Sequence, residues 1–254
     1  MHIIDEVGQQ FIEKTKYINM GTSPQNQGAP FPEYLQSANP NWQQIDLPDP
    51  SGINLGRADL RTIIEERRSV RRYQDEMLSL EEISYLLWLT QGIKRVSTKS
   101  GMTLRTVPSA GARHPFETYL SINKVAGIEP GLYHFLADAH KLEVVTLGEA
   151  VNQSLTIATL DQQHVATSAV TFIWVAVPYR TSWRYGSRAY RYLYLDAGHV
   201  CQNLHLAAEA IDCGVCAIGA YNDDLVNALI GIDGVEQFAI YLASLGKKST
   251  PEEA

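Results

Sequence analysis

Apolar residues at helical spacing predict regular structure from about Asp59 onward. Asp59 can cap a helix that runs to about Arg68. Farther on, Ser79-Leu80-Glu81-Glu82 is a capping box that precedes apolar residues at helical spacing. Two more helices are expected over Glu149 to Thr159 and Asp223 to Ile230.

The longest apolar stripe predicts a central helix. It begins after Tyr185, ends before Gly214 and repeats at i, i+4, i+7 and i+11 through Val200, Leu204, Ala207 and Ile211. A stripe of this length needs a large apolar surface to pack against, so the helix is expected at the middle of the fold.

Strand-like segments lie between these helices and after the last of them. Three form a predicted meander, with Gly127, Pro130-Gly131 and Asp138 between them: Thr118 to Ile122, Leu132 to Phe135 and Leu142 to Thr146. A buried strand is expected over Ala169 to Val177 and a last strand over Phe238 to Leu245. Helices mixed with a meander indicate an α+β architecture rather than regular βαβ alternation.

Residues 21–52 are rich in Pro, Asn, Gln and Ser and show neither the periodicity of a helix nor that of a strand. This stretch reads as an extended arm. It nevertheless holds Phe31, Tyr34, Leu35, Trp42 and Ile45, and so many apolar residues indicate that it lies against the rest of the protein. The expected division is an N-terminal extension over 1–58, a domain over 59–248 and a tail over 249–254.

Composition and charge exclude some classes of function for this protein. The 254 residues carry a formal charge of −7, which disfavours nucleic-acid binding through general basicity. The apolar stretch 169–177 is shorter than the roughly 20 residues of a membrane span, and the acidic N-terminus has no signal-peptide pattern. Three cysteines without a secretory context favour the cytoplasm.

Four arginines and a serine gather at the end of the first predicted helix, in the sequence Arg67-Arg68-Ser69-Val70-Arg71-Arg72. Guanidinium groups match phosphate oxygens bidentately, and the Ser69 hydroxyl adds a hydrogen bond. The alternative is that these basic residues complement the helix dipole and pair with Glu65 and Glu66. The sequence shows no G-x-G-x-x-G, Walker, H-E-x-x-H or G-x-S-x-G pattern.

The small-residue loop Pro108-Ser109-Ala110-Gly111-Ala112-Arg113-His114-Pro115 is a second candidate. Small side chains let a flat ligand approach the backbone, and Ser109 and Arg113 could hold its polar edge. An ordinary loop flanked by prolines is the alternative.

Two further patterns allow alternative interpretations. Arg180, Arg184, Arg188 and Arg191 would form a cationic stripe if their segment were helical, facing either an anionic ligand or carboxylates elsewhere in the protein. Cys213 and Cys216 have C-x-x-C spacing, but the motif follows a helix, and buried thiols without a metal are the expected state.

Together, these segments resemble the FMN-dependent nitroreductase superfamily, and its SagB-type dehydrogenase branch in particular, which includes the azoline oxidases. The resemblance covers about Leu60 to Lys248 and rests on the order of the motifs: the arginine cluster, the loop at 108–115, Tyr185-Gly186-Ser187-Arg188-Ala189-Tyr190-Arg191-Tyr192, Asp196-Ala197-Gly198-His199, Gln202-Asn203-Leu204 and Leu245-Gly246-Lys247-Lys248.

The resemblance implies a three-layer α-β-α fold with a mixed, mainly antiparallel sheet, in an intertwined homodimer with FMN at the interface. It implies that the flavin is held by Arg67, Arg68, Ser69 and Arg71, by Pro108, Ser109, Ala110, Gly111 and Arg113 from the other subunit, by the backbone of Ile218, Gly219 and Ala220 near N5 and O4, and by Lys247 or Lys248 at the phosphate.

The implied function is an FMN oxidoreductase that transfers hydride by a ping-pong mechanism, with NAD(P)H as an expected donor and a small molecule or peptide as substrate. Azoline oxidases carry a Lys-Tyr pair where this sequence has Arg184-Tyr185. A guanidinium cannot serve as a base, so Tyr185 is the candidate proton donor or acceptor, and Arg184 orients the substrate. The alternative is a non-catalytic flavin-binding or partner-binding subunit of a peptide-modifying complex.

Overall fold

A computed structural model describes residues 6–54, 59–97 and 102–249, so most of the tail at 249–254 lies outside the described residues. The α-helices are α1 (Glu6–Lys14), α2 (Leu60–Glu66), α3 (Leu80–Gln91), α4 (Ala150–Ala158), α5 (Gln163–Ala166), α6 (Pro178–Tyr185), α7 (Ala189–Glu209) and α8 (Asp223–Ile230). The strands are β1 (Gln44–Asp46), β2 (Ile93–Val96), β3 (Thr103–Arg105), β4 (Phe116–Ile122), β5 (Gly131–Leu136), β6 (Lys141–Leu147), β7 (Val170–Ala176), β8 (Cys213–Ile218) and β9 (Phe238–Lys247).

One seven-stranded sheet organises the protein, with strand order β1-β6-β5-β4-β7-β9-β8. Every neighbouring pair of strands in that sheet is antiparallel. A parallel component is supplied by an isolated bridge between Ser69 and Val215 on the edge strand β8. The sheet is therefore mainly antiparallel, as expected.

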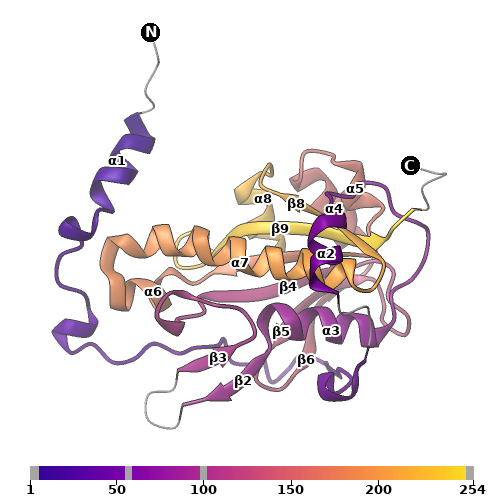
Figure 1. The fold of residues 1–254 in the computed structure, drawn as a ribbon, viewed down its shortest axis with the longest axis horizontal. Helices are drawn as coiled ribbons and strands as arrows, with labels where there is room; N and C mark the ends of the chain where they lie inside the picture. Colours follow the sequence, from indigo (N-terminus) through magenta and orange to yellow (C-terminus); the bar gives the residue numbers. More distant parts are fainter. Residues whose placement is uncertain (1–5, 55–58, 98–101, 250–254) are drawn as a thin grey trace.

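Helices cover both faces of the sheet, which gives the three expected layers (Figure 1). Along β7, Phe172 and Trp174 pack in the core with α3 and α7, whereas Ile173 and Val175 pack with α4, α5 and α8. Successive side chains of a strand point to opposite faces. Because both faces are buried, β7 is apolar throughout, and this explains the uninterrupted pattern in the sequence.

The predicted capping signals are confirmed. The Asp59 side chain accepts a hydrogen bond from the Arg61 N–H at the start of α2. At α3, the Ser79 hydroxyl accepts from the Glu82 N–H while the Glu82 carboxylate accepts from the Ser79 N–H. The helices expected at α4, α7 and α8 and the strands β4, β5, β6, β7 and β9 are also present, with ends within a few residues of those predicted.

The segment 180–191 is not one helix, so its four arginines do not form a single cationic stripe. Gly186 has φ +51° and ends α6, and a 3₁₀ turn at Gly186–Arg188 separates it from α7. A positive φ is costly for residues with a β-carbon, so glycine here permits the break. The arginines consequently point to different places: Arg180 is buried, whereas Arg188 and Arg191 donate to backbone carbonyls near α1.

The arm lies against the body, as its apolar residues predict. The Gln36 and Asn39 N–H groups donate to the buried carboxylates of Glu117 (2.7 Å) and Glu143 (2.9 Å). Its backbone also accepts from Arg180 Nε, at the Glu33 carbonyl (3.0 Å). In Figure 1 the arm follows the outside of the domain, and α1 projects away from it.

The arm is held by four buried charged groups, which together form its anchor: Glu117, His134, Glu143 and Arg180. His134 lies between the two carboxylates, at 3.0 Å from Glu117 and 2.8 Å from Glu143, and Arg180 contacts Glu117 at 2.5 Å. Burial alone would lower the pKa of His134, but hydrogen bonds and charges from both carboxylates outweigh it and raise the pKa to about 9. Burial would raise the pKa of Glu117, yet Arg180 and His134 hold it at about 2.

No helix among the described residues combines the length and the apolar character needed to cross a membrane.

Candidate functional site

The arginine cluster lines a cavity of about 200 Å³ at the edge of the sheet. Its lining comprises Arg68, Ser69, Val70, Arg71, Arg72, Lys248 and Ser249. The segment is held there by the Val70 N–H, which donates to the Val215 carbonyl of β8 at 2.9 Å. Gly214 makes this approach possible, because a β-carbon at that position would lie 2.5 Å from Val70 Cβ. The segment 68–72 is thus held along the edge strand β8, where it forms a ledge of arginines.

The arginines of this ledge have no carboxylate within ion-pair distance among the described residues. Glu65, which the alternative interpretation paired with them, instead contacts Arg61 at 2.8 Å. Arg68, Arg71 and Arg72 are exposed at the cavity. Arg67 does not line it, and its charge together with burial lowers the pKa of His205 on α7 to about 4. Unpaired guanidinium groups around a small cavity are suited to an anion.

The two terminal lysines point to different sides of the strand end. Lys247 contacts Glu82 of the α3 capping box at 2.5 Å and does not line the cavity. Lys248 lines the cavity and contacts Glu209 at 2.5 Å. Only Lys248 of this pair is therefore placed to contact a ligand of the arginine cavity.

Beyond β8, residues 219–221 present free backbone donors. The N–H groups of Gly219, Ala220 and Tyr221 have no acceptor among the described residues. Gly219 and Ala220 are exposed, and a β-carbon on Gly219 would meet no atom within 4 Å. These donors begin four residues beyond Val215, or about 13 Å along an extended strand.

A larger cavity of about 510 Å³ adjoins these donors. It lies between α7 and β9, and its lining comprises Tyr194, Ala197, Gly198, Gly219, Tyr221, Asp223, Phe238, Ala239, Ile240 and Tyr241. Aromatic and small residues predominate, as in pockets that accept flat organic ligands. The edge of β8 therefore connects an anion-binding ledge to a roomier aromatic cavity.

Asp196 of α7 holds the loop at 108–113. The Ser109 hydroxyl donates to Asp196 Oδ2 at 2.6 Å, and the Ala110 N–H lies 3.2 Å from both carboxylate oxygens. Burial raises the pKa of Asp196, and these two bonds oppose that effect. Arg113 is 2% exposed, donates to the Arg180 carbonyl at 2.7 Å and lies over the rings of Phe31 and Trp183.

The Ser109 hydroxyl, the Ala110 N–H and the Arg113 Nε thus have partners within this chain, whereas the buried Nη1 of Arg113 has none among the described residues.

Tyr185 and Arg184 lie against this same loop. A β-carbon on Gly111 would collide with the Tyr185 hydroxyl and would lie 3.3 Å from Arg184 Cδ. Gly111 also has φ +60°, a conformation that glycine adopts at little cost. The structure therefore brings the predicted proton-transfer residue next to the predicted flavin loop.

The two halves of the predicted site lie at different ends of α7 within one chain. Asp196 holds the loop, whereas Glu209 contacts Lys248 of the arginine cavity. Thirteen residues separate Asp196 from Glu209, or about 20 Å along a helix. One chain alone does not bring the loop and the arginines around a single ligand.

The thiols are buried. Cys201, Cys213 and Cys216 are free, and burial raises the pKa of Cys201 and of Cys213 to about 12. Cys213 and Cys216 both belong to β8, a strand that the sequence pattern did not predict. An odd spacing on a strand sends the two side chains to opposite faces. Among the described residues no group of three or more His, Cys, Asp or Glu could hold a metal ion.

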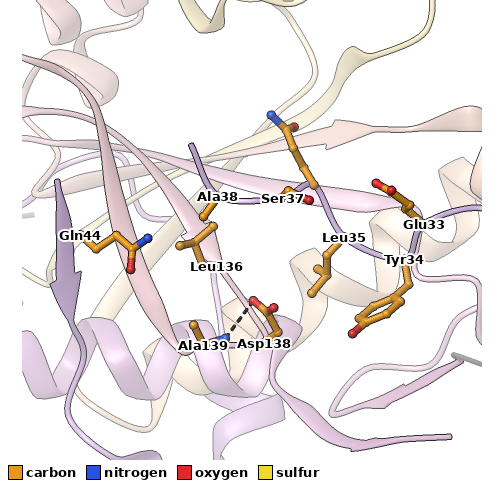
Figure 2. A pocket seen from close by; sticks show the side chains of 10 residues that line it. Glu33, Tyr34, Leu35, Ser37, Ala38, Gln44, Leu136, Asp138 and Ala139 are labelled. Carbon is orange, nitrogen blue, oxygen red and sulfur yellow. Dashed lines mark hydrogen bonds between the residues drawn. The ribbon is translucent and has the colours of Figure 1, made fainter. Parts of the chain in front are cut away.

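Another cavity, of about 290 Å³, lies under the arm (Figure 2). The arm residues Glu33 to Ala38 form one wall, and Leu136, Asp138 and Ala139 form the other. The Asp138 carboxylate accepts from the Ala139 N–H at 2.9 Å. None of the predicted site residues lines this cavity, and its charged groups are the carboxylates of Glu33 and Asp138.

The fold is that of the nitroreductases, a class of flavin-associated oxidoreductases, and comparisons with known proteins agree. The sequence pattern described as the nitroreductase family matches residues 64–247. The chain belongs to the nitroreductase family. It is 34% identical over 205 residues to the nitroreductase-like protein MJ1384 of Methanocaldococcus jannaschii, covering 81% of this chain and 96% of that protein.

A second curated relative is the trifolitoxin-processing protein TfxB of Rhizobium leguminosarum bv. trifolii. The two are 29% identical over 133 residues, which is 51% of this chain and 36% of TfxB. This chain thus matches about a third of TfxB's length.

Solved structures share the fold. A nitroreductase-like protein of Anabaena variabilis has a TM-score of 0.68 at 27% identity, over 83% of this chain and 42% of that chain. The Escherichia coli microcin synthetase McbBCD, bound to truncated pro-MccB17, has a TM-score of 0.60 at 19% identity, over 96% and 92%. A nitroreductase-like protein of Desulfovibrio desulfuricans in complex with FMN has a TM-score of 0.52 at 18% identity, over 76% and 91%.

Proposed function

We propose that this protein is an FMN-dependent oxidoreductase of the SagB-type dehydrogenase kind. The observation that carries the proposal is the ledge of unpaired arginines on β8, followed along the same edge by three free backbone donors and an aromatic cavity. This arrangement fits a molecule with one phosphate at one end and a flat, hydrogen-bonding ring at the other. When bound, FMN supplies the hydride chemistry of the ring.

The residues of this chain have separate roles in that proposal. Arg68, Ser69, Arg71 and Lys248 hold the phosphate by charge-assisted hydrogen bonds. The N–H groups of residues 219–221 face the ring edge at which negative charge develops on reduction, and donors fixed in advance stabilise that charge. FMN is favoured over FAD because the site has one cationic cavity and the sequence has no dinucleotide fingerprint.

A homodimer is part of the proposal. The loop at 108–111 lies about 20 Å from the arginine cavity along α7, so a second subunit is needed to bring a loop to each cavity. Large apolar side chains remain exposed on α2 and α7, including Leu60 (60%), Ile64 (52%), Tyr194 (57%) and Leu195 (59%). An apolar helix surface of this kind is typical of a subunit interface.

Peptide-modifying chemistry is the narrower proposal about the substrate. The name of TfxB and the peptide bound in McbBCD support it. NAD(P)H is the proposed electron donor, and the three buried thiols suit a reducing compartment such as the cytoplasm. Tyr185 is the proposed proton donor or acceptor for the organic substrate, with Arg184 beside it as an orienting charge.

The first test identifies the cofactor and its turnover. The protein is heated to release its ligand, the ligand is identified by chromatography, and flavin reduction by NADH or NADPH is followed by stopped flow. FMN is expected. Recovery of FAD, or of no flavin after reconstitution, would overturn the proposal, and flavin binding without reduction by any donor would instead favour the non-catalytic subunit.

The second test compares Tyr185→Phe with Arg184→Ala. Loss of a general acid or base costs on the order of a hundredfold in rate, whereas loss of an orienting charge weakens substrate binding. Tyr185→Phe should therefore slow the half-reaction with the organic substrate and leave flavin reduction by nicotinamide unchanged. Wild-type rates in both half-reactions would exclude proton transfer by Tyr185.

A further inference from the structure

A row of hydrogen-bonded side chains runs behind the edge strand, on the face of the sheet that α4, α5 and α8 cover. It begins at Tyr73, two residues after Arg71, and ends at the Ala220 carbonyl. The successive contacts are Tyr73 Oη to Ser244 Oγ at 2.8 Å, Ser244 Oγ to His164 Nδ1 at 2.8 Å, His164 Nε2 to Gln162 Oε1 at 3.0 Å and Gln162 Nε2 to the Ala220 carbonyl at 2.8 Å.

Gln162 fixes the direction of the bonds between His164 and the Ala220 carbonyl. Its amide nitrogen lies 2.8 Å from two carbonyl oxygens, those of Thr159 and Ala220, and only an NH₂ group can donate to both. The opposite amide orientation would place oxygen against two oxygens. Gln162 Oε1 must therefore accept, which makes His164 Nε2 the donor.

The tautomer of His164 in turn sets the direction of its bond with Ser244. A neutral imidazole with its proton on Nε2 accepts at Nδ1, so the Ser244 hydroxyl donates to His164. The single proton of the Tyr73 hydroxyl can go to Ser244 Oγ or to either of two carbonyl oxygens, those of Val70 (2.9 Å) and Ser244 (3.1 Å), so the direction of the bond at this end of the row is not fixed. Burial and the positive charge of Arg71 both lower the pKa of His164, in agreement with a neutral ring. Ser244 is fully buried and His164 is 6% exposed, so water does not easily replace these partners.

The last bond sets the direction of a peptide plane. The C=O of Ala220 and the N–H of Tyr221 belong to one trans peptide, in which they point in opposite directions. Because Gln162 holds the carbonyl, the Tyr221 N–H is directed away from the row. Tyr221 lines the 510 Å³ cavity, and its N–H has no acceptor among the described residues.

We propose that His164 is a positioning residue that, through Gln162, fixes the Tyr221 N–H, one of the backbone donors of residues 219–221, toward the ring of the bound flavin. This inference rests on the proposed function, which assigns the ring to the cavity beside those donors. The row also ties both ends of the site together, because Tyr73 belongs to the segment that carries the arginines. Preorganised donors should favour the reduced, more negative ring over the oxidised one.

The sharpest test is Gln162→Glu. A glutamate keeps the acceptor for His164 but replaces the donor to the Ala220 carbonyl by a second oxygen. Gln162 is half-buried, so the variant is expected to fold. The matched control is Gln163→Glu, which makes the same charge change one residue along, at an exposed position outside the row. His164→Phe removes both bonds of the imidazole and serves as a second variant.

Two readouts are needed. In the FMN-loaded protein, Gln162→Glu and His164→Phe should weaken binding of reduced flavin about tenfold more than binding of oxidised flavin, which lowers the two-electron midpoint potential by about 30 mV. In the protein without flavin, NMR should show the His164 proton on Nε2, and Gln162→Glu should shift the Ala220 and Tyr221 amide signals. Gln163→Glu should change none of these.

Failure of this inference is distinguishable from failure of the proposed function. If wild-type protein binds FMN but Gln162→Glu and Gln163→Glu have equal potentials, the positioning role is wrong and the cofactor assignment stands. A His164 proton on Nδ1 in the flavin-free protein would also overturn the inference. If wild-type protein binds no FMN, the proposed function is wrong, and the positioning role falls with it.

Discussion

Two groups of arginines in this protein have opposite surroundings. Arg180 is buried, contacts Glu117 and donates to the arm, and Arg113 next to it is covered by two aromatic rings. Arg68 and Arg71 are exposed around a small cavity and have no carboxylate partner among the described residues. The first group stabilises the chain, whereas the second is left for a ligand.

An arginine's function in this protein follows from the partners that it has within its own chain. A buried charge needs a counter-charge, hydrogen bonds or aromatic faces around it, because without such partners it would cost several kcal/mol. An exposed cluster without carboxylates carries mutual repulsion that an anion relieves. Replacing an arginine of the first group should therefore reduce stability, and replacing one of the second should reduce ligand affinity.

The largest expected effect is on stability at the arm's anchor. Arg180→Met removes the guanidinium from Glu117 and leaves it with His134 alone in the core, which should lower the free energy of unfolding by up to about 3–5 kcal/mol. Chemical denaturation measures the change. Arg72→Ala, on the exposed ledge, is the control and should stay within about 0.5 kcal/mol of wild type. Equal changes in the two variants would abolish the distinction.

The next effect is a pH dependence that belongs to the anchor alone. The folded pKa of His134 is raised from 6.5 to about 9, so its contribution to stability is fully present below pH 6.5 and is lost as the pH rises through 9. Each pH unit within that window removes at most about 1.4 kcal/mol. The difference in unfolding free energy between wild type and His134→Gln, measured from pH 6 to 10, should shrink as the pH rises; a constant difference would show that His134 is neutral.

A smaller effect is expected where the loop meets Tyr185. Gly111→Ala introduces a β-carbon at positive φ, which costs about 1–2 kcal/mol, and that carbon also collides with the Tyr185 hydroxyl. Gly127→Ala is the matched control, since Gly127 has φ +78° but no atom within 4 Å of a β-carbon. Both variants should lose stability, and only Gly111→Ala should alter the half-reaction that depends on Tyr185. Identical kinetics in the two variants would separate Tyr185 from the loop.

Local signals predicted much of the fold. The capping box at Ser79 and the apolar stripe through Val200 and Leu204 depend on neighbouring residues only, and both are confirmed. The start of the central helix after Tyr185 is confirmed, but the sequence left open whether 180–191 is one helix, because periodicity alone cannot distinguish one helix from two that share a spacing. Edge strands such as β1 and β8 were missed too, since short strands carry little pattern of their own.

The candidate site was partly predictable. The chemistry of the arginine cluster was visible in the sequence, but its lack of carboxylate partners depends on contacts between distant segments. The arm's anchor was missed, although a signal existed: His134 and Glu143 are titratable residues inside otherwise apolar strands. The row through His164 had no such signal, since Tyr73, His164 and Ser244 are far apart in sequence.

A fluorescence titration of flavin-free protein with FMN and with riboflavin, which lacks the phosphate, tests most directly whether the arginines bind the phosphate of the flavin. If the ledge of arginines binds that phosphate, Arg71→Ala should weaken FMN about ten- to a hundredfold, the value of one charge-assisted hydrogen bond of about 1.5–3 kcal/mol. Riboflavin affinity should change less than about twofold. Equal losses for both ligands, or no loss for FMN, would contradict the assignment of the phosphate to this cavity.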